Sequence, residues 1–167
     1  QLAELPIPTI CAMNGDVYGG GVELAVSCDF RVGVEGSRMR VPAAAIGLCY
    51  PLDGINRFVE CLGASLTRRV LVASEEFDAD TSLNVGFLDH LVPRQNLDVF
   101  ARKIAQNIAG LAPLAVQAMK SILREATKGP VDPEFVGKLT KTCLDSEDLQ
   151  EGFAAKREKR LPQFNGR

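Results

Sequence analysis

The stretch Tyr18-Gly19-Gly20-Gly21-Val22-Glu23-Leu24 places three consecutive glycines between a strand pattern and a helix pattern. Residues 8–13 are mostly apolar, which predicts a buried strand, and residues 22–27 predict a helix packed against it. Glycine permits a positive φ and a close approach of another group to the backbone. The first N–H groups of a helix have no intrahelical acceptor and lie at its positive end. We therefore expect a strand–helix turn that stabilises an oxygen carrying negative charge.

Glu23 lies three residues after Gly20, on the same face of the predicted helix. Exposed N–H donors with a carboxylate one turn away suit chemistry next to a carbonyl group. Two simpler interpretations stay open: the glycines form only a tight turn, and Glu23 only complements the helix dipole. The turn is not a P-loop, because no Lys-Ser/Thr pair follows it, and it lacks the spacing of the dinucleotide-binding motif.

Composition excludes several classes of protein. The 167 residues, with a net charge of −2, can form a sizeable core and argue against general nucleic-acid binding. The sequence shows neither a membrane-spanning apolar run nor a signal peptide, so we expect no membrane partner and a cytoplasmic location, with a mitochondrial one as the alternative. Five scattered cysteines without metal-ligand spacing predict buried free thiols in a reducing compartment and no metal site.

Near residue 95 the predicted secondary structure changes from a mixture of strands and helices to helices alone. Before it, strands are predicted at residues 28–34, 38–41 and 88–92, and helices at residues 55–62, 65–73 and 78–86. After it, helices are predicted at residues 97–109, 113–126, 132–144 and from 146 onward. We therefore expect an α/β core in residues 1–94 and a helical region in residues 95–167. His90, the single histidine, is interpreted as structural.

Several motifs are spread along the chain. They occupy residues 6–15, 19–25, 28–29, 42–48, 79–88 and 151–164. Together they resemble the signature of the crotonase superfamily, the enoyl-CoA hydratase/isomerase family. The resemblance spans essentially the whole chain and corresponds to the C-terminal two thirds of a family member. We therefore expect the N-terminal third of the family's chain to be missing here.

The resemblance implies an α/β fold: a crotonase-like ββα spiral core followed by a C-terminal helical oligomerisation region that builds a homotrimer or a dimer of trimers. It implies an acyl-CoA thioester as substrate, with coenzyme A part of that substrate and no separate cofactor. In the family two backbone N–H groups bind the thioester oxygen; the second maps to Gly20, with Gly19 and Gly21 beside the substrate. The first lies in the absent third. Because loss of one such donor costs about 2.7–4 kcal/mol of transition-state stabilisation, a chain without it is expected to be a poor enzyme.

Family hydratases use two glutamates that flank a water molecule. The first maps to Glu23. The second would follow Pro42, where this chain has Ala43, which cannot transfer a proton. Tyr50 and Asp53, in a loop that borders the family's acyl pocket, are the replacement candidates.

Two features leave alternatives open. Asp53 also fits a plain turn or N-cap residue. Lys159 matches a lysine that contacts the phosphates of coenzyme A in the family, with Lys156 and Arg160 as supporting neighbours, whereas a basic helix end is also typical of a solvated surface.

Three functions follow, in decreasing order of preference. The first is an acyl-CoA enzyme of enoyl-CoA hydratase/isomerase type, with Glu23 as acid/base. The second is another crotonase reaction through the same enolate: decarboxylation, double-bond isomerisation, or hydrolysis of a thioester or C–C bond. The third is a catalytically retired acyl-CoA-binding protein.

Overall fold

The computed structural model describes residues 2–167, which form two compact units. Unit 1 comprises the chain up to Leu5 together with Thr9–Lys103, and unit 2 comprises Pro6–Pro8 and Ile104–Arg167. The sequence placed a boundary between residues 94 and 95, just before helix α4 (Leu97–Ala109). The two compact units part inside that helix, after Lys103.

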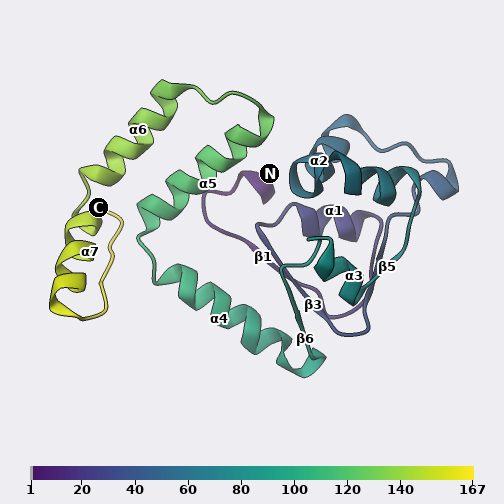
Figure 1. Ribbon diagram of the computed structural model, residues 1–167, viewed down its shortest axis with the longest axis horizontal. Coiled ribbons are helices and arrows are strands. Elements are labelled where there is room, and N and C mark those ends of the chain that lie inside the picture. Colours follow the sequence, from purple (N-terminus) through teal and green to yellow (C-terminus); the bar gives the residue numbers. More distant parts are fainter. Residues whose placement is uncertain (1) are drawn as a thin grey trace. The chain divides into compact units, whose positions relative to one another are not determined.

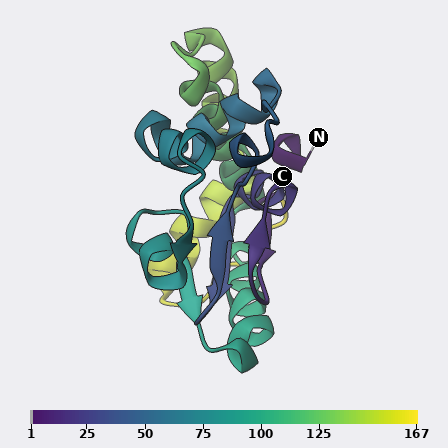
Figure 2. The ribbon, with the colours of Figure 1, turned by 90° about the vertical axis from the view of Figure 1, so that its right-hand side faces the viewer.

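Unit 1 contains two small sheets, to which the first four strands along the chain belong alternately. The first sheet is parallel and has the order β1 (Ile10–Ala12), β3 (Phe30–Val34), β6 (His90–Val92). Figure 2 shows these three strands side by side. In the second sheet, β2 (Val17–Tyr18) pairs parallel with β4 (Arg38–Arg40), which pairs antiparallel with β5 (Phe77–Asp78). A chain that alternates between two sheets in this way forms a spiral core.

Three α-helices accompany these sheets: α1 (Gly20–Val26), α2 (Leu52–Thr67) and α3 (Ala79–Asn84). Short 3-10 helices occupy Leu2–Glu4, Ala44–Ile46 and Arg94–Asn96. Helix α1 packs against α2, as Figure 1 shows. The largest fully buried side chains of the core are Phe58, Phe77, Phe87 and Met39. Each such side chain stabilises the fold by about 1.5–3 kcal/mol through its removal from water.

The structure corrects the prediction near Asp53. A turn was expected at Asp53 and Gly54, but both residues lie in the first turn of α2, which begins at Leu52. Pro51 takes the N-cap position with an extended backbone (φ −67°, ψ 155°). The predicted break at Gly63 is real (φ 71°, ψ 161°), yet the helix resumes beyond it to Thr67 and continues as one π-helical turn, Arg68–Val72.

The cysteines are less buried than the sequence suggested. All five are free, but Cys49 is exposed and the other four are only partly buried, so the prediction of five buried thiols is wrong. Cys49 is exposed because it lies in the loop before α2, where several apolar residues face solvent. Burial beside Cys28 raises the pKa of the Cys11 thiol to about 11, which keeps it protonated and unreactive at neutral pH.

Unit 2 is helical. Helix α5 (Pro113–Lys128) packs against α6 (Pro133–Leu144), and α6 packs against α7 (Glu147–Glu158). Polar side chains cap two of these helices, because the Asp132 carboxylate accepts from the Glu134 N–H (3.0 Å) and the Ser146 hydroxyl from the Leu149 N–H (3.2 Å). The predicted start of the last helix at Ser146 is therefore confirmed.

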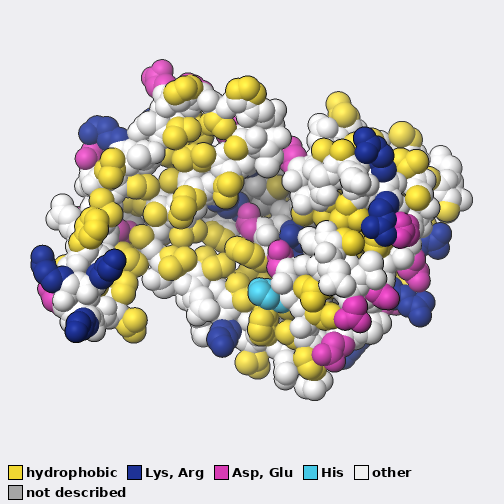
Figure 3. Space-filling view, viewed as in Figure 1, with side chains coloured by type: hydrophobic (Ala, Val, Ile, Leu, Met, Phe, Trp, Pro, Cys, Tyr) yellow, Lys and Arg dark blue, Asp and Glu magenta, His cyan; other side chains and the backbone are white. Residues whose placement is uncertain are grey.

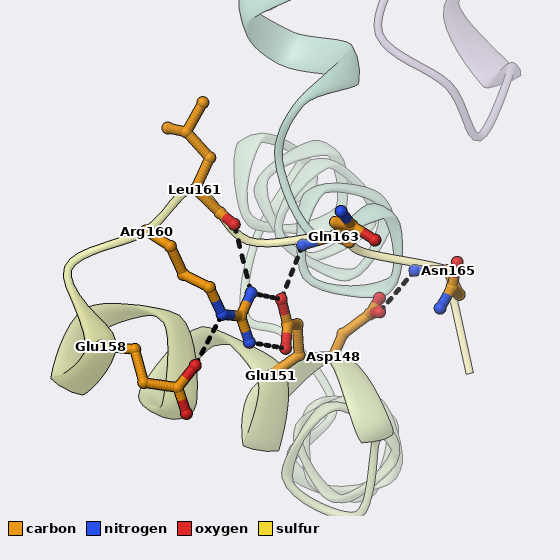
Figure 4. A network of polar contacts seen from close by, with 7 residues as sticks. All are labelled: Asp148, Glu151, Glu158, Arg160, Leu161, Gln163 and Asn165. Carbon is orange, nitrogen blue, oxygen red and sulfur yellow. Dashed lines mark hydrogen bonds and ion pairs between the residues drawn. The ribbon is translucent and has the colours of Figure 1, made fainter.

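The end of the chain folds back on α7 through two carboxylates (Figure 4). The Glu151 carboxylate accepts two hydrogen bonds from the Arg160 guanidinium (2.5 and 2.7 Å) and one from the Gln163 N–H (2.8 Å). The buried Asp148 carboxylate accepts from the N–H groups of Asn165 and Gly166 (2.7 and 3.0 Å). These bonds hold the last residues against the first turns of the helix.

We expect this attachment to weaken in acid. Hydrogen bonds from Arg160 and from the Gln163 N–H lower the pKa of Glu151 from 4.5 to about 2. Because the pKa is lower in the folded protein, the stabilisation is present above about pH 4.5 and is lost as the pH falls toward 2. Thermal unfolding measured between pH 7 and 3 should therefore show a steeper fall for the wild type than for Glu151→Gln. Glu60→Gln, on the exposed face of α2, serves as the charge-matched control, and identical slopes in all three proteins would contradict the prediction.

Two further results concern residues 2–167 alone. None of their helices is both long and apolar enough to cross a membrane. Nor do they bring three or more His, Cys, Asp or Glu side chains together in a way that could hold a metal ion. His90 lies edge-on to Phe100, with ring centroids 5.1 Å apart.

Candidate active site

The three glycines form the predicted strand–helix turn between β2 and α1. Gly19 is the N-cap residue of α1 and has φ 51° and ψ −119°, a conformation that side chains strongly disfavour. Its N–H donates to the Arg40 carbonyl (2.9 Å), which ties the turn to β4. A Cβ atom on Gly21 would lie 3.0 Å from the Val17 side chain, so this position also has little room for a larger residue.

Two of the N–H groups at the start of α1 have no acceptor within residues 2–167. The N–H groups of Val22 and Glu23 turn back to the Gly19 carbonyl (3.0 and 3.3 Å). Those of Gly20 and Gly21 donate to no group in the part of the chain that the structure describes. Apart from its chain neighbours and the backbone of its own helix, no atom lies within 4 Å of the position that a Cβ of Gly20 would occupy, so the approach to this residue is open. The turn thus presents two N–H donors at the positive end of a helix.

Glu23 lies in the first turn of the same helix, and its carboxylate is close to the start of α2. A Cβ atom placed on Gly54 would lie 3.4 Å from Glu23 Oε1 and 2.9 Å from Tyr50 Cδ1. The carboxylate and the tyrosine ring therefore flank the same buried glycine. Only a residue without a side chain allows Glu23, Tyr50 and α2 to approach one another in this way.

Tyr50 is held by ring contacts as well. Its ring meets that of the fully buried Phe58 edge-on, with centroids 5.7 Å apart and planes at 88°. Burial and the nearby Glu23 carboxylate raise the pKa of the phenol, so the hydroxyl stays protonated at neutral pH. Within residues 2–167 Tyr50 accepts a hydrogen bond from the Cys49 thiol through its backbone carbonyl, and its hydroxyl has no partner. Tyr50 thus has an unengaged O–H group, on a ring that lies against the same glycine as the Glu23 carboxylate.

The backbone of Glu23 is fixed by two residues that the sequence patterns did not single out. The Ser27 hydroxyl donates to the Glu23 carbonyl (2.6 Å) and accepts a hydrogen bond from the Arg57 guanidinium (3.1 Å). Arg57 lies three residues after Gly54, so one face of α2 meets the Glu23 carboxylate at Gly54 and reaches the Glu23 carbonyl indirectly, through Ser27. The only sequence signal for this contact was a glycine and an arginine at helical spacing, which is too common to be informative.

The structure places the other two predicted positions of unit 1, Ala43 and Asp53, in different surroundings. Ala43 is 5% exposed and packs in the hydrophobic core, just before the 3-10 helix Ala44–Ile46. Asp53 is exposed at the second position of α2 and makes no hydrogen bond or ion pair within the described residues. Its interpretation as a turn or N-cap residue is wrong, because Pro51 holds the N-cap position; Asp53 complements the helix dipole instead.

The predicted contacts for coenzyme A lie in unit 2. Lys156 is in the last turn of α7, and Lys159 caps that helix in a left-handed conformation (φ 57°). Both side chains are exposed. Arg160 was expected to support them, but its guanidinium is already bound by the carboxylates of Glu151 and Glu158 (Figure 4).

Comparison with known proteins gives a consistent picture. The family described as "Enoyl-CoA hydratase/isomerase" matches residues 1–167. The chain is 33% identical to the carnitinyl-CoA dehydratase of Citrobacter koseri, over 100% of this chain and 66% of that protein. It therefore spans about two thirds of the length of the curated relatives it matches.

Solved structures show the same relation. The chain is similar to a putative enoyl-CoA hydratase/isomerase family protein from Hyphomonas neptunium, with a TM-score of 0.90, 32% identity, and coverage of 99% of this chain and 64% of that one. It is also similar to an enoyl-CoA hydratase/carnithine racemase from Magnetospirillum magneticum, with a TM-score of 0.91, 29% identity, and coverage of 99% and 62%. The predicted α/β fold of crotonase type is thereby confirmed. The chain belongs to the enoyl-CoA hydratase/isomerase family of the crotonase superfamily.

Proposed function

We propose that this protein is an acyl-CoA enzyme of enoyl-CoA hydratase/isomerase type. The observation that carries the proposal is the pair of free N–H groups at Gly20 and Gly21, on the same short helix as the Glu23 carboxylate. A thioester oxygen bound at this turn gains negative charge as an enolate forms, and the N–H groups stabilise it there. The membership of the chain in the family supports this assignment.

Glu23 is the proposed acid/base of the reaction. Its carboxylate accepts a proton from a water molecule while the water oxygen bonds to the β carbon of an enoyl thioester. The electrons of the double bond move to the thioester oxygen, which the Gly20 N–H stabilises, with Gly19 and Gly21 beside the substrate. The reverse sequence removes water from a 3-hydroxyacyl thioester, the direction that the name carnitinyl-CoA dehydratase describes in a relative.

The substrate is proposed to be an acyl-CoA thioester, with no cofactor besides its own coenzyme A. Lys159 and Lys156 carry the charges proposed to meet the phosphates, since both are exposed whereas Arg160 is engaged by two carboxylates. No acidic side chain is bonded to either lysine in the part of the chain that the structure describes.

The helical region is proposed to build a homotrimer or a dimer of trimers. Large apolar side chains are exposed on unit 2, and Figure 3 shows hydrophobic side chains spread over its helices. They include Leu111, Met119, Leu123, Leu144, Phe153 and Leu161. Exposed apolar surface of this extent is typical of a protein–protein interface.

Ala43 favours a second candidate function. Because this buried alanine replaces the second carboxylate of the family's hydratases, the enolate at Gly20 could be formed or consumed without hydration. Decarboxylation, double-bond isomerisation and hydrolysis of a C–C bond pass through such an enolate. Hydrolysis of a thioester passes through a tetrahedral oxyanion, whose charge lies on the same oxygen and is stabilised by the same N–H group. A catalytically retired acyl-CoA-binding protein is the remaining alternative.

A panel of acyl-CoA thioesters decides among these functions. The purified protein is incubated with a short 2-enoyl-CoA, a 3-enoyl-CoA, a malonyl-type CoA and a saturated acyl-CoA, and products are identified by mass spectrometry and NMR. Hydration of the 2-enoyl-CoA is the expected result. Carbon dioxide release, double-bond migration or free coenzyme A without hydration would assign the second function, and binding without any turnover would assign the retired one.

A further inference from the structure

The proposed hydration leaves one proton transfer without a donor. When water adds to the β carbon, the α carbon of the enolate must also receive a proton. The position of the family's second glutamate is Ala43, which is buried in the core and carries no transferable proton. Either Glu23 performs both transfers, or another group near it donates the second proton.

The structure places the ring of one further proton donor, Tyr50, against the same glycine as the Glu23 carboxylate. Tyr50 and Glu23 flank Gly54 from two sides, at 2.9 and 3.4 Å from the position of its missing Cβ. Asp53, the other candidate, is exposed in the first turn of α2, and its carboxylate has no bonded partner in the described part of the chain. Of the two replacement candidates, Tyr50 alone shares this contact with Glu23.

Two contacts fix the tyrosine ring, so its hydroxyl is presented from a rigid support. The ring meets the fully buried Phe58 edge-on, and it touches the backbone of α2 at Gly54. The phenol is kept in its protonated form by burial and by the Glu23 charge, which raise its pKa. Among the described residues the hydrogen bond of Tyr50 is that of its backbone carbonyl with the Cys49 thiol, so the O–H is available to a ligand.

We propose that Tyr50 is a second catalytic residue, whose hydroxyl donates the proton that the α carbon receives. The inference rests on the proposed hydratase function. One water proton goes to Glu23, and the water oxygen bonds to the β carbon; the enolate collapses to the thioester as its α carbon takes the phenol proton. The proton on Glu23 then returns to the phenolate through solvent water. The net change is the addition of one water molecule across the double bond.

Tyr50→Phe and Tyr50→Leu test the proposal in a hydration assay with a 2-enoyl-CoA. Tyr50→Phe keeps the ring contacts with Phe58 and Gly54 but lacks the O–H, so we expect unchanged thermal unfolding, unchanged KM and a kcat about 10²-fold lower. Tyr50→Leu should lose the same activity and also stability. If Tyr50→Phe keeps the wild-type kcat while only Tyr50→Leu loses it, the ring acts by packing alone and the proposal is overturned.

Exchange of the α protons of a saturated acyl-CoA with D2O, followed by NMR, isolates the second transfer. This substrate has no double bond to hydrate, so the exchange reports proton transfer at the α carbon alone, and Tyr50→Phe should lose it. Exchange that Tyr50→Phe retains at the wild-type rate assigns both transfers to Glu23 and overturns the role of Tyr50. A wild type that hydrates no enoyl-CoA would overturn the hydratase function itself. A wild type that hydrates it, with an equal rate in Tyr50→Phe, would overturn only the role of Tyr50.

Discussion

Glu23→Gln should lower the kcat for hydration of a 2-enoyl-CoA by about 10²–10⁴-fold, the usual contribution of a general acid or base. The amide has the shape of the carboxylate and fits the same space beside Gly54 and Tyr50. It cannot accept a proton from water, so the step that forms the bond to the β carbon loses its base. Steady-state kinetics should therefore show the loss in kcat, with KM nearly unchanged.

The controls separate this loss from damage to the fold. Glu23 is half-buried and its backbone carbonyl, which the amide variant keeps, holds the Ser27 hydroxyl, so we expect the thermal unfolding midpoint to stay within a few degrees of the wild type. Glu60→Gln makes the same chemical change on the exposed face of α2 and should leave kcat unchanged. Equal rates for Glu23→Gln and the wild type would remove Glu23 from the mechanism.

Sequence patterns located the elements that carry their own start and stop signals. Helix α4 occupies Leu97–Ala109 as predicted, and α7 begins after the Ser146 cap. The strands β2 and β5 were missed, since each has two residues and forms only by pairing with β4. A two-residue strand has no periodicity of its own, so its existence depends on tertiary contacts that local sequence does not encode.

In the candidate site, too, local sequence predicted some residues, whereas the position of others depends on tertiary contacts. Glu23 and Gly20 could be predicted, because a glycine-rich strand–helix turn with a carboxylate three residues on is a local pattern. Whether Tyr50 or Asp53 lies beside Glu23 depended on where α2 begins. The extended backbone of Pro51 starts the helix at Leu52 and places Gly54 under the tyrosine ring, so Tyr50 contacts the site.

Arg160 shows why charge patterning alone overestimated the phosphate-binding cluster. In the sequence it is one of several basic residues at a helix end. In the structure Glu151 and Glu158 bind its guanidinium; Arg160 follows the end of α7, and Glu151 lies nine residues before it, within that helix. Hydrogen bonds across that spacing require the chain to turn back after α7, which no short-range pattern reveals.

Gly20→Pro should lower kcat by about 10²–10³-fold, because it removes one N–H donor from the proposed oxyanion site and little else. Gly20 is the first residue of α1, a position where proline fits well since its missing N–H would have no intrahelical acceptor. The preceding Gly19 has φ 51° and ψ −119°, outside the α region that a following proline disfavours. We therefore expect the variant to fold, as judged by circular dichroism and thermal unfolding.

Gly20→Ala is the matched control, since it adds a Cβ atom and keeps the N–H. Apart from the chain neighbours and the backbone of the same helix, no atom lies within 4 Å of that Cβ position, so a methyl group causes no clash with the protein. If the N–H stabilises charge that develops on the thioester oxygen, proline lowers kcat and kcat/KM by the same factor while alanine changes both only slightly. A comparable loss in both variants would indicate that bulk at this position blocks the substrate, and a loss in neither would show that the enolate is not stabilised at this helix start. The comparison thus tests the N–H group itself, separately from the space that the glycine leaves open.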